Sequence, residues 1–171
     1  MKRLLLLSTL LITLNSFADE LSDAEDAYDR GDYTTAITWF KKLAEQDVAL
    51  AQFILGSMYQ YGEGTPQDYK AAIKWYTKAA EQGHSWAQFN LAVMYYKGKG
   101  TPQNYKAAIK WYTKSAEQGH AYAQFNLGVM YYNGYGTPQD YVMAHMFWNI
   151  AAANGDEDED AKTNRDIVAD M

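Results

Sequence analysis

The chain has 171 residues, no cysteine and a formal net charge of −6. An acidic surface repels phosphate backbones, so the composition argues against nucleic-acid binding. The lack of cysteine excludes disulfides, a lipid-modified N-terminal cysteine and thiolate metal sites.

The first 18 residues have the three-part pattern of a secretory signal peptide. Lys2 and Arg3 form a positively charged start, an apolar run follows, and Ser16-Phe17-Ala18 fits a small-x-small cleavage site. The apolar run would span about 16 Å as a helix, roughly half the hydrocarbon core of a bilayer, which is too short for a membrane anchor. We expect cleavage before Asp19, a periplasmic or secreted location, and no stable membrane insertion afterwards.

A segment of 36 residues then occurs three times without a gap, at 49–84, 85–120 and 121–156. The first two copies agree at 26 of 36 positions. A shorter relative, residues 19–48, precedes them, and we number the four segments repeats 1 to 4 in chain order. A fixed period of this size predicts a solenoid, in which each repeat buries its apolar face against its neighbours.

Each repeat begins with a predicted helix, which we call helix A. In repeat 3 it covers about residues 84–96, where Ala87, Leu91 and Met94 recur at helical spacing. The glycine pair that follows, Gly98 and Gly100, can adopt positive φ where the chain reverses. These G-x-G pairs follow helices and lack the third glycine of a nucleotide-binding loop, so we interpret them as turns.

A second predicted helix, helix B, completes each repeat and in repeat 3 runs to about Gln118. Two residues are candidates for its N-cap. Thr101 followed by Pro102 fits the N-cap and N1 positions, and Asn104 is itself a good N-cap. We expect Gly119 to end the helix in the left-handed conformation.

Lysines at four-residue spacing mark helix B in repeats 2 and 3, and we expect them to form a solvated outer face. In repeat 4 the same positions are apolar, which predicts a covered surface. The lysines are Lys70, Lys74, Lys78, Lys106, Lys110 and Lys114, and their replacements are Val142, Met146 and Ile150. Residues 157–171 are predicted to form a C-terminal capping helix whose apolar residues (Ala161, Ile167, Val168 and Met171) cover this stripe. We expect a monomer; the alternative is association through this C-terminal face.

The repeats resemble the Sel1-like repeat, a relative of the tetratricopeptide repeat. The matching pattern is A-x-x-x-L-G-x-M-Y-x-x-G-x-G-T-P-Q-D-Y-x-x-A-x-x-W-Y-x-x-A-A-E-Q-G, carried nearly whole by 51–83, 87–119 and 123–155. Repeat 1 departs from it, because it lacks the G-x-G loop. The resemblance implies an all-α fold, a right-handed α/α superhelix of stacked helix pairs, used for protein–protein contact with no particular partner specified.

By resemblance to tetratricopeptide proteins, helix A would line a concave groove that binds a protein or peptide. The candidate partner-binding residues are Leu50, Trp86, Asn90, Tyr96, Tyr122, Asn126 and Tyr132. Aromatic side chains give a large contact area at low entropic cost. Phe53, Phe89 and Phe125, identical in every copy, are interpreted as core between repeats. Asn90 and Asn126 could bind a peptide backbone or cap a neighbouring loop.

The sequence contains no arrangement that predicts catalysis. No serine has lysine three residues later, and no G-x-S-x-G occurs. His84 and His120 recur at one repeat boundary, which indicates a loop feature rather than a metal site. We therefore expect no enzyme activity, no cofactor and no metal, but a protein-interaction module (an adaptor or scaffold) of the bacterial envelope or secreted. The alternative is a peptidoglycan or carbohydrate platform built on exposed aromatics.

Overall fold

The computed structural model describes residues 19–155, all of them in helices or the loops that join them. The signal peptide expected at 1–18 and the capping helix expected at 157–171 lie outside these residues. Among the described helices, none is both long and apolar enough to cross a membrane. The chain divides into two compact bodies, body 1 up to Trp75 and body 2 from Tyr76 onward.

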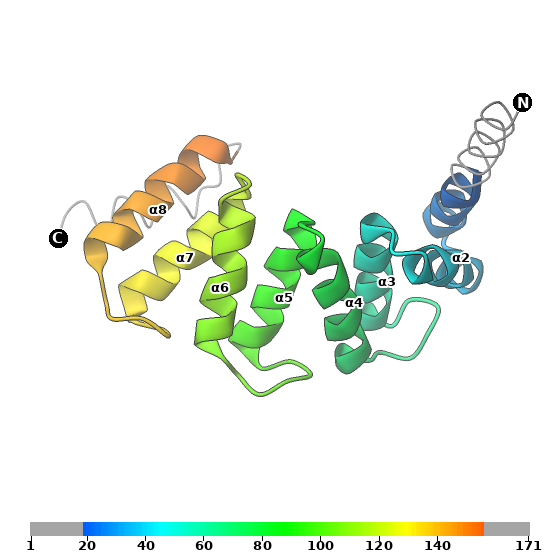
Figure 1. Ribbon diagram of the computed structural model, residues 1–171, viewed down its shortest axis with the longest axis horizontal. Helices are drawn as coiled ribbons and strands as arrows, with labels where there is room; N and C mark the ends of the chain where they lie inside the picture. Colours follow the sequence, from blue (N-terminus) through cyan, green and yellow to red (C-terminus); the bar gives the residue numbers. More distant parts are fainter. Residues whose placement is uncertain (1–18, 156–171) are drawn as a thin grey trace, which may run out of the picture. The chain divides into compact units, whose positions relative to one another are not determined.

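Body 1 contains helical residues 19–29, α2 (Tyr33–Glu45), α3 (Ala49–Tyr61) and the first half of α4 (Tyr69–Glu81) (Figure 1). Apolar side chains from these four helices form one buried core. Its members include Ala24, Ala27, Ala36, Phe40, Leu43, Leu55, Met58 and Trp75.

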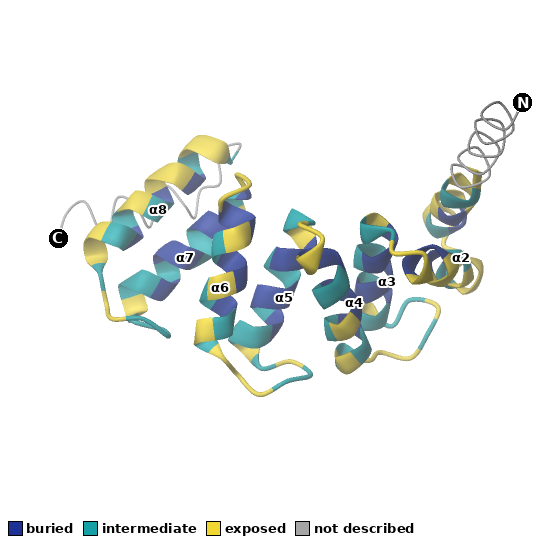
Figure 2. Cartoon of the chain, viewed as in Figure 1, coloured by how far each residue is buried: buried dark blue, intermediate teal, exposed yellow. Residues whose placement is uncertain are grey.

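Up to residue 155, body 2 contains the rest of α4 and four further helices. These are α5 (Ser85–Lys97), α6 (Tyr105–Ala116), α7 (Ala121–Asn133) and α8 (Tyr141–Asn154). Each packs on the next along the chain, α5 on α6, α6 on α7 and α7 on α8. This sequential packing, with helices and no strand between residues 19 and 155, confirms the predicted all-α fold of stacked helix pairs. Figure 2 shows buried residues concentrated in α5 and α7 and exposed residues along α8.

The helix ends in repeats 3 and 4 have identifiable caps. Asn104 caps α6, because its side-chain oxygen accepts a hydrogen bond from the backbone N–H of Ala107 at 3.0 Å. Asp140 caps α8 in the same way, through the N–H of Met143 at 2.9 Å. The structure thus decides between the two predicted starts of helix B in favour of Asn104.

The second glycine of the loop is required by space as well as by backbone conformation. Gly136 has φ of +72°, and a Cβ there would lie 2.8 Å from Cβ of Tyr105 in the preceding repeat. A Cβ at Gly64 would overlap the backbone of Tyr33 in the same manner. Each of these loops therefore packs directly on the first residue of the preceding helix B.

A buried glutamine in each helix A ties neighbouring repeats together. Its side-chain amide donates to the carbonyl eight residues earlier, at the end of the preceding helix B. The bonds run from Gln52 to Ala44 (3.1 Å), from Gln88 to Ala80 (3.0 Å) and from Gln124 to Ala116 (3.0 Å). The same glutamines accept in turn, Gln88 from Gln118 at 2.8 Å and Gln124 from Asn154 at 3.1 Å.

Repeat 4 contains a paired change inside its core. It has Gly128 and Trp148 where repeat 3 has Ala92 and Tyr112. A Cβ at Gly128 would lie 2.8 Å from Cε2 of the Trp148 ring. The missing side chain lets the larger indole approach α7 and donate its N–H to the carbonyl of Phe125 at 3.1 Å.

Candidate functional site

The second residue of each complete helix A is a large exposed side chain. Leu50, Trp86 and Tyr122 occupy this position in α3, α5 and α7, with 37%, 49% and 52% of their surface exposed. Leu50 lies in body 1, whereas Trp86 and Tyr122 lie in body 2. Because about half of the surface of Trp86 and of Tyr122 is exposed, a ligand can contact both rings.

Tyr96 and Tyr132, predicted on the same face, are half-buried in aromatic clusters. The Tyr96 ring lies 5.5 Å from Tyr105 and 6.1 Å from Tyr135. Burial raises the pKa of Tyr96, and the neighbouring Tyr135 and Tyr105 add to the effect. Tyr132 lies 5.3 Å from Tyr141. These two tyrosines join helix A to helix B, and less of their surface is available to a partner.

The two candidate asparagines are also half-buried. Asn126 donates from its side-chain amide to the carbonyl of Tyr122 at 2.7 Å, within α7. Asn90 makes no hydrogen bond to any described residue. Within residues 19–155, neither side chain caps a neighbouring loop.

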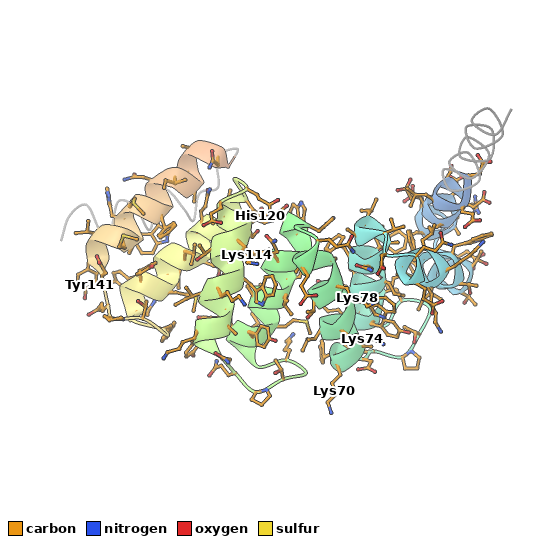
Figure 3. The ribbon with its side chains drawn as sticks, viewed as in Figure 1. Lys70, Lys74, Lys78, Lys114, His120 and Tyr141 are labelled. Carbon is orange, nitrogen blue, oxygen red and sulfur yellow. The ribbon has the colours of Figure 1, made fainter. Side chains whose placement is uncertain are left out.

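His120 lies among the aromatic residues of α5 and α7. Its ring is stacked on Phe89 at 4.8 Å and meets the Trp86 ring edge-to-face at 4.2 Å. Tyr122 lies 6.1 Å from it on the other side. The Phe89 ring also lies 6.3 Å from Tyr122 of repeat 4, but Phe89 is half-buried and is not among the buried core residues. Figure 3 marks His120 at the junction of α6 and α7.

The hydrogen bonds of His120 fix its tautomer. Nδ1 accepts from the backbone N–H of Ala123 at 3.4 Å and so caps α7. The proton of the neutral ring is therefore on Nε2, which is buried and has no hydrogen-bond partner among residues 19–155. Burial lowers the pKa of His120, which keeps the ring uncharged near pH 7. An unpaired buried donor costs about 1–3 kcal/mol.

A cavity of about 420 Å³ opens beside these rings, and we call it the Trp86 cavity. Its lining comes from the start of α5, the turn between α6 and α7, and the end of α8. The lining residues are Ser85, Trp86, Gln118, Gly119, His120, Ala121, Tyr122, Asn154 and Gly155. None of these nine is Asp, Glu, Lys or Arg, so the described wall is uncharged.

Body 1 contains a second cavity of about 390 Å³, between helical residues 19–29 and α3. Phe40, Phe53 and Ile54 give it an apolar lining, while Glu25 and Asp29 add two carboxylates. Tyr28, also in the lining, donates to Glu63 at 3.0 Å. Burial and this hydrogen bond raise the pKa of Tyr28 to about 12. This cavity suits an apolar ligand with positive charge.

Five of the six lysines on helix B are exposed, as expected for an outer face, and Lys78 is half-buried. Figure 3 labels Lys70, Lys74 and Lys78 on α4 and Lys114 on α6. Lys114 and Lys110 also lie 4.9 and 5.5 Å from the ring centre of Trp111, within range of a cation–π contact. On α8 the replacement side chains are exposed; the exposed fractions of Val142, Met146 and Ile150 are 80%, 40% and 38%.

Of the residues that line the Trp86 cavity, only Trp86 and Tyr122 were among the predicted site residues. His120 was interpreted as a loop feature, and Gln118 and Asn154 were not singled out. The signal that could have found the last two is their common position, 36 residues apart at the end of helix B. Among residues 19–155, no group of three His, Asp or Glu side chains is placed to hold a metal ion.

Comparison with known proteins identifies the repeats. The Sel1 repeat family matches residues 26–48, 49–84, 87–120 and 121–156. A crystal structure of a Sel1 repeat protein from Oxalobacter formigenes is 36% identical, with a TM-score of 0.81 over 86% of this chain and 60% of that one. The protein c5321, a protective antigen of uropathogenic Escherichia coli with an SLR fold, is 38% identical, with a TM-score of 0.79 over 88% of this chain and 33% of that one.

A third structure, Helicobacter pylori cysteine rich protein B, shares the fold at 20% identity, with a TM-score of 0.60 over 77% of this chain and 93% of that one. A search of curated proteins finds no match. The chain thus spans 60% and 33% of the length of the two relatives with higher identity. Proteins built from these repeats are generally non-enzymatic scaffolds for protein–protein contact. On the match of all four repeats, the chain belongs to the Sel1 repeat family.

Proposed function

We propose that this chain is an exported, non-catalytic interaction module that binds a protein or peptide partner on its helix A face. The observation that carries the proposal is the pair of exposed rings, Trp86 and Tyr122, beside the uncharged Trp86 cavity. Exposed aromatics that flank a cavity are the usual anchors of protein interfaces. Within body 2, Asn90, Tyr96, Asn126 and Tyr132 extend this face, and Leu50 occupies the position equivalent to Trp86 in body 1.

Two features support export to the bacterial envelope or beyond. Residues 1–18 have the signal-peptide pattern, and the similar protein c5321 is a protective antigen of uropathogenic Escherichia coli. Cell fractionation followed by N-terminal sequencing tests this. We expect a periplasmic or extracellular product that begins at Asp19; a cytoplasmic product that retains Met1 would contradict it.

The binding function is tested by affinity capture from envelope extracts, with each captured protein identified and then purified. Wild type is compared with the Trp86→Ala/Tyr122→Ala double variant. We expect the affinity for the purified partner to fall at least about tenfold in the variant. The matched control is Lys106→Ala/Lys110→Ala on helix B, which should bind as wild type. Equal affinity of all three proteins would reject the proposed face.

A carbohydrate ligand is the second candidate. Exposed Trp86 and Tyr122 rings can stack on sugar faces, and the uncharged cavity wall suits a neutral ligand. Sedimentation with purified peptidoglycan sacculi separates the two functions. Co-sedimentation that is lost in the double variant would favour the carbohydrate function. If the wild-type chain stays in the supernatant and still binds its protein partner, the carbohydrate function is excluded.

A further inference from the structure

The cavity of body 1, which we call the Tyr28 cavity, combines an apolar wall with negative charge. Its volume of about 390 Å³ lies near the lower end of the usual range for ligand sites, which suits one long side chain. Phe40, Phe53 and Ile54 form the apolar part of the wall. Two carboxylates from helical residues 19–29 form the charged part, and the whole lining belongs to one compact body.

The two carboxylates, Glu25 and Asp29, lie on one face of their helix because they are four residues apart. Both side chains are exposed, and neither makes an ion pair with any residue between 19 and 155. Within the described chain, their negative charge is therefore open to a cation on a ligand.

The pKa of Tyr28 reports the charge of this wall. Burial is the largest cause that raises this pKa to about 12, and the hydrogen bond to Glu63 and the negative charges of Glu63 and Asp29 raise it further. The Tyr28 hydroxyl therefore keeps its proton near pH 7 and donates it to Glu63 at 3.0 Å. The same charges that disfavour a tyrosinate favour a cation in the cavity.

The aromatic part of the wall suits a planar cation. The Tyr28 ring meets the Phe40 ring edge-to-face at 6.3 Å and the Tyr33 ring at 5.2 Å, so its place in the wall is fixed. The guanidinium group of arginine stacks on aromatic rings and donates to carboxylates in a fork, while its stem packs on apolar surface. Arginine is therefore the side chain that can use both parts of the wall.

The two carboxylates distinguish repeat 1 from the other repeats. The turn after each helix A contains a glycine at positive φ, from which positions can be counted back; these are Gly31, Gly62, Gly98 and Gly134. Two residues before this glycine the four repeats have Asp29, Gln60, Tyr96 and Tyr132, and six residues before it they have Glu25, Gly56, Ala92 and Gly128. The stacking of repeats therefore does not require acidic residues at these positions.

We propose that the Tyr28 cavity binds one arginine side chain of a protein partner. Its guanidinium group lies against Glu25 and Asp29, and its stem packs on the apolar wall. The inference rests on the proposed function for the existence of a partner, and it adds a contact in body 1 with a stated chemistry.

The test uses N-acetyl-arginine N-methylamide as the probe and the citrulline compound of the same length, which is uncharged, as its control. Nuclear magnetic resonance follows the methyl groups of Ile54 and the backbone N–H of Ser57 during titration of the purified chain. We expect saturable shifts with the arginine probe and an affinity at least about tenfold lower for citrulline, which cannot make charge-assisted hydrogen bonds to both carboxylates.

Two double variants separate the site from the general charge of the helix. Glu25→Gln/Asp29→Asn should lower the affinity for the arginine probe at least about tenfold and leave that for citrulline unchanged. Asp23→Asn/Asp26→Asn removes the same charge from exposed positions of the same helix outside the lining and should bind as wild type. Thermal melting of both variants confirms that the fold is retained.

Equal affinity for the two probes, or an equal loss in the two double variants, would overturn the proposal. Tighter binding of free arginine than of the capped probe would overturn the assignment to a protein partner. A captured partner whose affinity falls with Trp86→Ala/Tyr122→Ala but not with Glu25→Gln/Asp29→Asn would leave the proposed function standing and remove the arginine site. A partner that shows the opposite response would support the arginine site and reject the face in body 2.

Discussion

At the scale of single residues, the junctions between repeats depend on polar groups as much as on apolar ones. Gln52, Gln88 and Gln124 are each at least 97% buried, yet each amide is hydrogen-bonded. Each bond reaches a carbonyl in the last turn of the preceding helix B, which also accepts a backbone N–H from the turn that follows that helix. The glutamine therefore fixes the register of one repeat on the next.

Gln124→Ala should lower the free energy of unfolding by about 1–3 kcal/mol, since it removes two hydrogen bonds of a buried side chain, one to the carbonyl of Ala116 and one from the amide of Asn154. Urea denaturation followed by circular dichroism measures this. Asn133→Ala is the control, because Asn133 is exposed and bonds only within its own helix. A Gln124→Ala midpoint equal to that of the control would show that the junction does not depend on this bond.

Gly128→Ala should also destabilise the fold, by about 1–3 kcal/mol, because its methyl group would overlap the Trp148 ring. Adding Trp148→Tyr to Gly128→Ala recreates the Ala92 and Tyr112 pair of repeat 3 and should restore most of the loss. Thermal melting of the single and double variants forms the test. Failure of the second change to rescue the first would mean that the two positions are not coupled.

Residues that recur with the period were the most predictable. The left-handed conformation expected at Gly98, Gly100 and Gly119 follows from local sequence alone, and the structure confirms it. The Trp86 cavity could not be predicted, because it brings together residues from the ends of four helices. Its partner atoms are 30 or more residues apart, as in the Gln118–Gln88 bond, so their approach depends on how helices pack.

At the scale of helices, the starts of α5 and α7 are capped by an unusual residue. His84 and His120 accept hydrogen bonds through Nδ1 from the N–H groups of Ala87 and Ala123. Protonation of Nδ1 removes the acceptor, and burial lowers the pKa of both rings. The stability of these helix ends is thus linked to pH.

The lowered pKa of the two histidines determines the direction in which stability changes with pH. The histidines of the unfolded chain bind protons near pH 6.5, while the folded rings stay neutral. The contribution of the two caps to the stability of the fold is therefore complete above about pH 6.5 and declines as the pH falls below it. We expect the unfolding midpoint of His120→Asn to depend less on pH than that of wild type between about pH 5 and 7.5. Asparagine keeps the cap without titrating. Parallel pH profiles for the two proteins would contradict the linkage.

Helix α8 differs from its counterparts in the face it exposes. Lys106, Lys110 and Lys114 on α6 remain in solvent although α7 and α8 follow. If a further helix packed on α8 as α7 packs on α6, the side chains of Val142, Met146 and Ile150 would remain exposed to solvent. A capping helix that covers this stripe must therefore dock differently from a further helix A.

Deleting residues 161–171 tests the predicted cap. Each aliphatic side chain that the segment buries contributes roughly 1.5–3 kcal/mol, so the thermal midpoint should fall and light scattering should reveal association. The matched variant Val142→Lys/Met146→Lys/Ile150→Lys should lower the midpoint of the full chain and not that of the truncated one. A truncated protein with an unchanged midpoint that remains monomeric would show that the stripe is open to a partner instead.

At the scale of the whole molecule, stability is a sum of local terms. In body 1 α2 contacts α3, and in body 2 the helices from α5 to α8 contact one another in chain order. The buried glutamines join repeats through bonds that span eight residues. The period alone predicts this architecture, since a repeat that contacts only its neighbours needs no long-range pairing.

Removal of residues 85–120 as one block should yield a helical, cooperatively folding protein with a lowered midpoint. In the shortened chain Gln124 meets Ala80 as Gln88 does now, because the two junctions are alike. Circular dichroism and thermal melting measure the outcome. Deletion of 85–102 breaks the period and is the control, which we expect to abolish cooperative melting. Loss of cooperativity in both deletions would contradict interchangeable junctions.

The glutamine bond also has an evolutionary consequence. A recombination event that duplicates 36 residues copies the donor, the acceptor and the register together, so the new junction requires no further mutation. The number of repeats can then change by whole units, while the surfaces at the two ends of the array stay the same. The surface on helix A lengthens or shortens accordingly, and selection can act on single positions such as Trp86 and Tyr122 without first repairing the fold.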